Sequence, residues 1–531
     1  MVVAPQPEAV AAGADVLRAG GNALDATIAC ALTQGVVDPL MCGIGGFGVM
    51  QIFDPASGAH LVYEGFGACP LESRADQWEG IYLGDTTDGF GHRLQGFVNE
   101  AGAMAVTAPP ILRLLSNAHQ RFGRLNWSEL FSEAIVQAES GWMIRPHVYT
   151  VFTQNERKYG RMNYGEKLGL TEDGRRIYLE EDGSYKKPGA MVRNPDLART
   201  LRQLAAEGAD SFYFGDLAKR IVADVRSQGG ILSLQDFASL VVPESVPMSV
   251  DYRGWRIATP PPPAGGQLVA EILKILEHFE LTKLAHNSPE YIRILFEAMK
   301  VGLRDREAFI GDPNFMDNPV ARLLSQAYTQ GIANDIHHGK KASVDRRTAA
   351  ESKHTTHVSA MDANGMMVSF THTLGNPSGF IVKDSGFMLN GAMSQFDPMP
   401  GRPNSIEPGK RRISSMAPTL VFDQDRPVLT IGAPGASWIG PAVAQVLVNI
   451  LDWGMPIQEA ISAPRVVATS NAIDISNRIP RTTEEALVRQ GYEVRRSYNS
   501  YAFAGVHGIT HFDGVIRGGA DPQRDGYAAG V

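Results

Sequence analysis

The chain has 531 residues, of which 44% are hydrophobic and 20% are charged, as in a globular protein with a sizeable core. The formal net charge is −8, and no basic stripe with interleaved aromatic residues occurs, so we expect no nucleic-acid partner. The chain has three cysteines, Cys30, Cys42 and Cys69, which are too few for a disulfide framework, and an odd number leaves at least one unpaired. No apolar stretch reaches the roughly 18 residues of a membrane span, and residues 1–8 lack a signal peptide, so we expect no membrane contact and a cytoplasmic location.

Helices and strands alternate over the first part of the chain. Apolar residues at helical spacing, with glycine near several ends, predict the helices 9–18, 23–32, 111–122, 127–140, 195–207, 217–228 and 266–279. Two strands, 47–53 and 61–64, flank the turn 54–58. Residues 160–190 are rich in Gly, Lys, Glu and Asp, which predicts an exposed excursion.

After residue 355 the pattern changes to strands. Short apolar and β-branched runs predict the strands 358–361, 367–373, 387–389, 419–422 and 428–431. A turn at 362–365 separates the first two strands, and a helix is predicted at 441–453. The strand-rich end of the chain favours an α+β protein.

The most informative segment is His354-Thr355-Thr356-His357. The polar residues before it, 346–353, have no apolar periodicity and are typical of an exposed linker, so the segment lies where a linker enters a strand. Two β-branched residues are also ordinary strand residues, and for the Thr-Thr pair alone that interpretation stays open. A peptide bond at this place is nevertheless well situated to be cut.

Cleavage between His354 and Thr355 would give Thr355 a free α-amine. A threonine hydroxyl is a weak nucleophile and needs a nearby base. An α-amine has a pKa of about 7.7–8.0, so a sizeable fraction is neutral at physiological pH. The new N-terminal residue would therefore carry both a nucleophile and its base.

Several further blocks accompany the Thr-Thr-His motif. In chain order they are residues 13–26, 39–48, 261–266, 414–419, 432–437 and 519–526. In sequence and order they resemble the motifs of the γ-glutamyltranspeptidase family of N-terminal-nucleophile hydrolases. The resemblance implies a four-layer αββα sandwich. It also implies self-cleavage into a large piece, 1–354, and a small piece, 355–531, which stay together as one intertwined heterodimer.

The resemblance assigns roles to the reacting groups. Thr355 is the nucleophile, and Thr373 matches the family's second threonine, whose hydroxyl contacts the amine of the first. The N–H groups of Gly435 and Ala436 correspond to the oxyanion hole, where aligned donors stabilise the tetrahedral intermediate. The family has two glycines there, and alanine keeps the backbone donor if its φ is compatible. A plain strand threonine is the alternative interpretation of Thr373.

The substrate-binding positions depart from the family. Phe66 stands where an arginine binds the α-carboxylate of the γ-glutamyl group, and Gln395 stands where an aspartate binds its α-amine. Asn376 is shifted from the family's asparagine, whereas Ser414 and Ser415 match its carboxylate-binding serines. A zwitterion without ionic partners in a closed site costs several kcal/mol. We therefore expect a small-molecule amide hydrolase, or an acyltransferase, that acts on a non-γ-glutamyl acyl group, as in oxamate or cephalosporin side chains.

Two other functions stay open. A true γ-glutamyl transpeptidase or glutathione hydrolase would need another arginine, such as Arg74 or Arg93, to reach the pocket. An inactive relative could act as a binding protein, and such a protein would have no reason to cleave itself.

Three other kinds of site are disfavoured. Residues 43–48 match Gly-x-Gly-x-x-Gly, but a dinucleotide loop follows a strand and opens a helix, whereas this one follows a helix and opens a strand. His354, His357 and His372 lack an aligning helix and a cysteine or carboxylate to complete a metal site. No Gly-x-Ser-x-Gly elbow of a serine hydrolase occurs. We expect neither a metal nor another cofactor.

Overall fold

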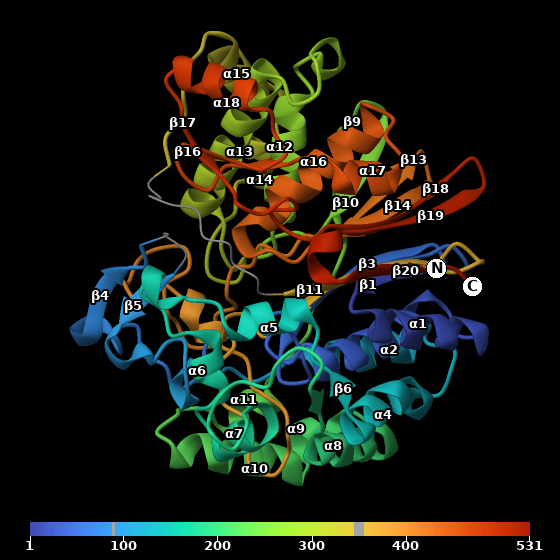
Figure 1. The fold of residues 1–531 in the computed structure, drawn as a ribbon, viewed down its shortest axis with the longest axis vertical. Coiled ribbons are helices and arrows are strands. Elements are labelled where there is room, and N and C mark those ends of the chain that lie inside the picture. Colours follow the sequence, from blue (N-terminus) through green and yellow to red (C-terminus); the bar gives the residue numbers. More distant parts are fainter. Residues whose placement is uncertain (88–90, 345–354) are drawn as a thin grey trace.

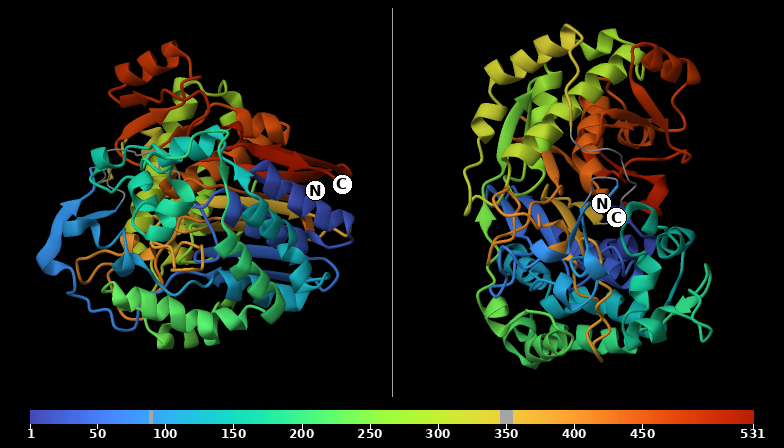
Figure 2. Two further views of the ribbon diagram at one scale, coloured as in Figure 1. Left: turned by 60° about the horizontal axis from the view of Figure 1, so that its bottom comes forward. Right: turned by 90° about the vertical axis from the view of Figure 1, so that its left-hand side faces the viewer.

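The computed structural model describes residues 1–87, 91–344 and 355–531. Two antiparallel sheets pack face to face, and helices cover the outer face of each (Figure 1). This is the expected four-layer αββα sandwich. The chain termini lie side by side at one edge of the layers, as the two further views in Figure 2 also show. Within the described ranges no helix is long and apolar enough to cross a membrane.

The first sheet has seven strands in the order β20-β1-β11-β12-β2-β3-β8. Their bounds are Gly526–Ala529, Val2–Pro5, Thr356–Met361, Met367–Thr373, Phe47–Asp54, Ala59–Gly65 and Glu244–Ser245. Strands β11, β12 and β20 come from residues 355–531, and the other four come from residues 1–344. The two pieces expected from self-cleavage therefore share one hydrogen-bonded sheet.

The second sheet has six strands in the order β19-β18-β14-β13-β10-β9. Their bounds are Val515–Ala520, His507–Phe512, Arg426–Gly432, Thr419–Asp423, Trp255–Thr259 and Met248–Tyr252. Val3, Met361 and Met367 of the first sheet pack against Leu420 and Phe422 of the second. Because period-2 alternation gives each strand two faces, the opposite faces remain for the helices.

Each helical layer is anchored to its sheet by apolar side chains. Helices α1 (Pro7–Arg18) and α2 (Ala23–Val37) cover the first sheet, and α12 (Gly266–Leu276) and α16 (Ile439–Leu451) cover the second. Helix α2 begins with a capping box between Asn22 and Asp25, and it is buried along almost its whole length. A helix that is apolar all round belongs between layers, and α2 lies between the sheet and α4 (Ser132–Ser140).

Most predicted elements near the nucleophile are confirmed, and two predictions are wrong. Residues 387–389 form no strand, because Met388 and Leu389 make only isolated bridges to loop residues. Residues 160–190 are not simply exposed, since they form α6 (Tyr164–Leu168) and α7 (Glu172–Tyr178). Their charge misled the prediction because Lys167, fully buried, is paired with Glu100.

Candidate active site

Thr355 and Thr373 lie side by side at the end of the first sheet. Strand β11 begins one residue after Thr355 and pairs with β12, which ends at Thr373. Thr355 Oγ1 donates a hydrogen bond to Thr373 Oγ1 at 3.1 Å, and Thr373 Oγ1 also accepts one from the N–H of Gly375 at 2.8 Å. Both threonines are buried, yet both line one cavity. The sheet thus holds two hydroxyl groups at a cavity wall.

The backbone of Thr355 is strained. Its φ is 88°, in a region that a β-branched residue rarely adopts. The carbonyl oxygen of Thr355 accepts a hydrogen bond from Arg524 Nη1 at 3.1 Å, and Arg524 is itself buried. A charge-assisted hydrogen bond of this kind stabilises a conformation that the residue would otherwise leave. Strain is therefore stored next to the peptide bond that is expected to break.

Thr356, the second threonine of the motif, serves a different purpose. Its Oγ1 accepts a hydrogen bond from Gln34 Nε2 of α2 at 2.9 Å, and Gln34 Oε1 is bonded to His372 Nε2 at 2.9 Å. Because side chains alternate along a strand, Thr356 faces the helical layer while Thr355 faces the cavity. Gln34 thus supports the strands that carry the two site threonines, a role that the sequence pattern did not predict. The available signal was a glutamine near the end of a mostly apolar helix.

The loop after β14 supplies two backbone donors. Gly435 has φ 143° and Ala436 has φ 51°, and across the described ranges neither N–H group donates to a protein acceptor. A Cβ on Gly435 would lie 2.6 Å from the Cβ of Ala504, so only glycine fits there. Ala436 lines the cavity, whereas Gly435 lies outside its lining. The expected oxyanion donors are thus unpaired, and at least one of them is at the cavity.

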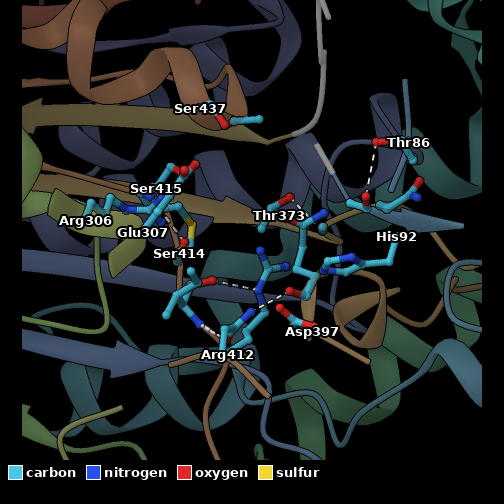
Figure 3. Close-up of a pocket in the computed structure, with 18 of the residues that line it drawn as sticks. Thr86, His92, Arg306, Glu307, Thr373, Asp397, Arg412, Ser414, Ser415 and Ser437 are labelled. Carbon is cyan, nitrogen blue, oxygen red and sulfur yellow. Dashed lines mark hydrogen bonds between the residues drawn. The ribbon is translucent and has the colours of Figure 1, made fainter. Parts of the chain in front are cut away.

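The cavity has a volume of about 1030 Å³ (Figure 3). It brings together most of the predicted site residues, namely Thr355, Thr373, Asn376, Gln395, Ser414, Ser415 and Ala436. Phe66 is absent from its wall. Its side chain is buried in an apolar cluster that contains Phe47 and Met416, both of which do line the cavity. This corrects the prediction that Phe66 itself contacts the acyl group, because the residue supports the wall instead.

Asn376 lines the cavity, but its amide is already engaged. Lys167 Nζ donates to Asn376 Oδ1 at 2.7 Å, and Asn376 Nδ2 donates to Glu100 Oε2 at 2.6 Å. Burial lowers the pKa of Lys167, and the Glu100 carboxylate opposes that shift. A buried charged pair with its hydrogen bonds satisfied fixes the orientation of the groups that it holds. Asn376 is therefore a rigid part of the wall.

Gln395 ends the short helix η7 (Ala392–Gln395) and is half-buried. Its carbonyl accepts a hydrogen bond from Asn404 Nδ2 at 2.5 Å, while in the described ranges its side-chain amide has no partner. Within the described ranges, no protein group therefore competes with a ligand for this amide at the cavity wall. A neutral amide here offers no countercharge to an ammonium group.

Ser414 and Ser415 are placed by the Pro-Gly block 261–266. The N–H of Ser414 donates to the carbonyl of Pro263 at 2.8 Å. A Cβ on Gly265 would lie 2.4 Å from the Ser415 carbonyl oxygen, so the two segments pack at backbone contact. This close approach is a physical reason for glycine in that block.

The two arginines considered for a γ-glutamyl site differ. Arg93 lines the cavity and donates from Nη2 to the Leu83 carbonyl at 2.9 Å. Arg74 is exposed and pairs with Asp76 at 3.2 Å, away from the cavity. Of these two arginines, only Arg93 is placed for that role, while Arg306, Arg402 and Arg412 also line the cavity.

The two described histidines of the motif region, His357 and His372, are buried strand residues. His357 is bonded to Thr371 Oγ1 and Ser359 Oγ, each at 2.9 Å. Burial lowers the pKa of His372 to about 3 and the pKa of His357 well below its usual value, so both rings are neutral. No cluster in residues 1–87, 91–344 and 355–531 has the ligands for a metal ion. His354, on the other side of the expected cut, lies outside the described residues.

Comparison with known proteins agrees with this geometry. The sequence model of the family described as Gamma-glutamyltranspeptidase matches residues 9–531. The chain belongs to the γ-glutamyltranspeptidase family. The expected family, sandwich fold and enzyme class, an amide hydrolase with an N-terminal nucleophile, are thereby confirmed.

Relatives with two kinds of name are similar to this chain. The Acylase ACY 1 proenzyme of Pseudomonas sp. (strain V22) is 34% identical, over 99% of this chain and 92% of its own. The Glutathione hydrolase proenzyme of Bacillus subtilis (strain 168) is 30% identical, over 100% of this chain and 91% of its own. Among solved structures, the cephalosporin acylase from Bacillus halodurans has a TM-score of 0.87 at 27% identity, over 99% of this chain and 95% of its own.

Proposed function

We propose that the chain is a self-processing threonine amidohydrolase whose acyl group is not γ-glutamyl. The observation that carries this proposal is the strained Thr355, whose Oγ1 lies 3.1 Å from Thr373 Oγ1 in the wall of the large cavity. The relatives named proenzymes support the processing step. The neutral Gln395 supports the change of substrate.

Maturation begins with Thr355. Its Oγ1 attacks the carbonyl carbon of His354, the C–N bond breaks, and the acyl group passes from nitrogen to oxygen. Water then hydrolyses the ester, which leaves a carboxylate on His354 and a free α-amine on Thr355. Pieces 1–354 and 355–531 stay associated as a heterodimer, because each sheet contains strands of both.

Catalysis uses the same hydroxyl. The α-amine of Thr355 takes the hydroxyl proton as Oγ1 attacks the amide carbonyl, and the N–H groups of Gly435 and Ala436 stabilise the oxyanion. The leaving amine takes the proton, and an ester on Thr355 remains. Water or an acceptor amine then removes the acyl group. Thr373 orients the attacking oxygen through the hydrogen bond already described.

Glutathione hydrolysis is the second candidate. Two observations favour it, namely Arg93 in the cavity wall and relatives named glutathione hydrolases. In that case Arg93 would bind the α-carboxylate that Phe66 cannot bind. A kcat/KM above about 10⁴ M⁻¹s⁻¹ for a γ-glutamyl anilide, a value typical of efficient enzymes, would favour this candidate over our proposal.

The proposal is tested with the purified protein. Gel electrophoresis should show two bands, and N-terminal sequencing of the smaller piece should begin at Thr355. A panel of amides should include hydrolysed substrates, and treatment with EDTA should leave their hydrolysis unchanged because Thr355 supplies nucleophile and base. An uncut protein that hydrolyses no amide would overturn the proposal. A loss of activity that zinc restores would instead favour a metal site that includes His357 and His372.

A further inference from the structure

Residues 341–344 of the large piece, which we call the arm, are bound by polar side chains outside the cavity wall. The binding groups lie on or beside α13 (Pro289–Phe309), which belongs to the large piece, and α18 (Arg481–Arg489) and β16 (Ala472–Ile475), which belong to the small piece. Helices α13 and α18 lie side by side in the upper half of Figure 1. The arm is therefore fixed between the two pieces, shortly before the expected cut.

A buried charged pair holds the main chain of Ala342. Its N–H donates to Glu297 Oε2 at 2.8 Å, and its carbonyl accepts from Lys300 Nζ at 2.7 Å. Glu297 and Lys300 lie 3.1 Å apart, and Glu297 Oε1 also accepts from the Tyr492 hydroxyl at 3.0 Å. The side chains of Glu297 and Lys300 are 1% and 2% exposed, and such a pair is costly to bury unless further hydrogen bonds satisfy it. The arm supplies one such bond to each partner.

Val344, at the end of the arm, is held like a residue in a strand ladder. Its N–H donates to Asn471 Oδ1 at 3.1 Å, and its carbonyl accepts from Asn471 Nδ2 at 2.8 Å. Lys341 Nζ donates to the carbonyls of Gln490 and Gly491 at 3.0 and 2.9 Å, just past the C-terminal end of α18, where a cation is favoured. Asn471, Gln490 and Gly491 all belong to the small piece.

Release of the arm would leave charges buried without their partners. Glu297 and Lys300 would each lose one hydrogen bond, which is the costly way to break a buried pair. Val344 and Thr355 are thus both fixed, one on each side of residues 345–354, since Thr355 is held by its strand and by Arg524. Fixing both ends of a short segment reduces the entropy that is lost when a peptide bond within it meets a nucleophile.

We propose that Glu297, Lys300 and Asn471 form a clamp that positions the precursor for self-cleavage and keeps the arm bound to the small piece afterwards. This inference rests on the proposed self-processing function. None of the three residues lines the cavity, so the clamp acts on processing and not on acyl transfer. Loss of the clamp should therefore slow the cut and spare the turnover of the enzyme once it is cut.

Two variants remove the clamp in different ways. In the double variant Glu297→Leu/Lys300→Met both charges leave together, a change that buried pairs often tolerate, whereas Asn471→Ala removes both hydrogen bonds to Val344. Each precursor, made by cell-free synthesis and followed by gel electrophoresis, should be cut about 10-fold more slowly than the wild type, the effect of one or two lost hydrogen bonds. After complete cleavage, kcat and KM for an amide that the wild type hydrolyses should be unchanged.

Asn126→Ala is the matched control. Asn126 is also an exposed asparagine of the helical layers, and its Nδ2 donates to Glu129 Oε2 at 2.8 Å within the large piece. Its loss should lower the unfolding temperature as Asn471→Ala does, and leave the rate of self-cleavage at the wild-type value. Wild-type cleavage rates in both clamp variants, or a kcat that falls in parallel with the cleavage rate, would overturn the inference.

Hydrogen exchange needs no clamp variant to fold. The amides of Ala342 and Val344 should be protected in the uncut Thr355→Ala precursor and equally protected in the cut wild-type enzyme, because both are bonded in the clamp. Fast exchange in the precursor, or protection that is lost on cleavage, would overturn the clamp while self-cleavage, and with it the proposed function, still stood. If instead the wild type were never cut, the proposed function itself would fail.

Discussion

The nucleophile region and the acyl-binding region of the cavity are built in different ways. Thr355 and Thr373 stand at the ends of central strands, where ladder hydrogen bonds, α2 and Arg524 fix them. Most of the acyl-binding wall comes from loops and short elements between β12 and β13 and after β4 (Tyr82–Asp85), and the long helix α13 (Pro289–Phe309) adds Arg306 and Glu307. A change of side chain in those loops alters charge without disturbing either sheet. We therefore expect the family's chemistry to be retained at the strand ends and its specificity to vary with the loop side chains.

The largest effect is expected at Thr355 and should distinguish it from Thr356, the other threonine of the motif. Thr355→Ala should leave the chain uncut and lower amide hydrolysis by at least about 10³-fold, because nucleophile and base are both lost. Thr356→Val, the matched control, removes only the hydrogen bond from Gln34, worth about 1 kcal/mol, and should still be cut. Gel electrophoresis and anilide assays measure both outcomes. Cleavage that survives in Thr355→Ala would contradict the assignment.

A smaller effect is expected at the residue that positions the nucleophile. Arg524→Gln weakens the hydrogen bond to the Thr355 carbonyl, and we expect processing to slow and kcat to fall by about 10- to 100-fold with KM little changed. A time course of processing and steady-state kinetics check this. A rise in KM at constant kcat would instead place Arg524 in substrate binding.

In the acyl-binding region we expect substitutions to change which substrate is preferred rather than to abolish activity. Gln395→Asp should raise kcat/KM for a γ-glutamyl anilide by about 10-fold, with a smaller change for an anilide whose acyl group is uncharged, because the new carboxylate attracts an ammonium group. Gln395→Asn controls for the shorter side chain. Phe66→Arg should instead lower the unfolding temperature, since it places a charge in a buried apolar cluster. Equal changes for both anilides in Gln395→Asp would contradict the proposed location of the amine.

The smallest effect concerns pH. Burial raises the pKa of Asp38 to about 7, against an opposing effect of Arg524. The folded state therefore binds more protons than the unfolded state between about pH 4 and pH 7, so this residue's contribution to stability falls as pH rises through that window. Asp38→Asn should flatten this fall in stability. Unfolding temperatures of the wild type and the variant, measured at pH 5 and pH 8, test this expectation.

Asp474, on β16 (Ala472–Ile475), is the matched control. Burial raises its pKa to about 7 as well, but it lies in a small separate sheet. Asp474→Asn should flatten the stability profile in the same way and leave the pH profile of activity unchanged. Asp38→Asn should shift the activity profile, through Arg524 and Thr355. If the pH profile of activity were the same in both variants, Asp38 would have no influence on the active site.

The sequence predicted the nucleophile region well because its signals are local. Strand periodicity and the turn at 362–365 determine β11 and β12, and the register of these strands then brings Thr355 to Thr373. Arg412 and Arg524 could not be assigned in this way. Arg524 lies within a recognised block and Arg412 lies two residues before one. Whether an arginine is paired depends on long-range contacts, as the difference between Arg411, which pairs with Glu64, and its neighbour Arg412 shows. The buried pair of Lys167 and Glu100 escaped prediction for the same reason.

The most direct test of the account is intact-mass spectrometry of the enzyme quenched during turnover of a slow amide substrate. We predict two chains with the masses of residues 1–354 and 355–531, and a transient added acyl mass on the smaller one, located by fragmentation at Thr355. An acyl group on the larger chain, or turnover by a single uncut chain, would contradict the claim that Thr355 becomes an N-terminal nucleophile.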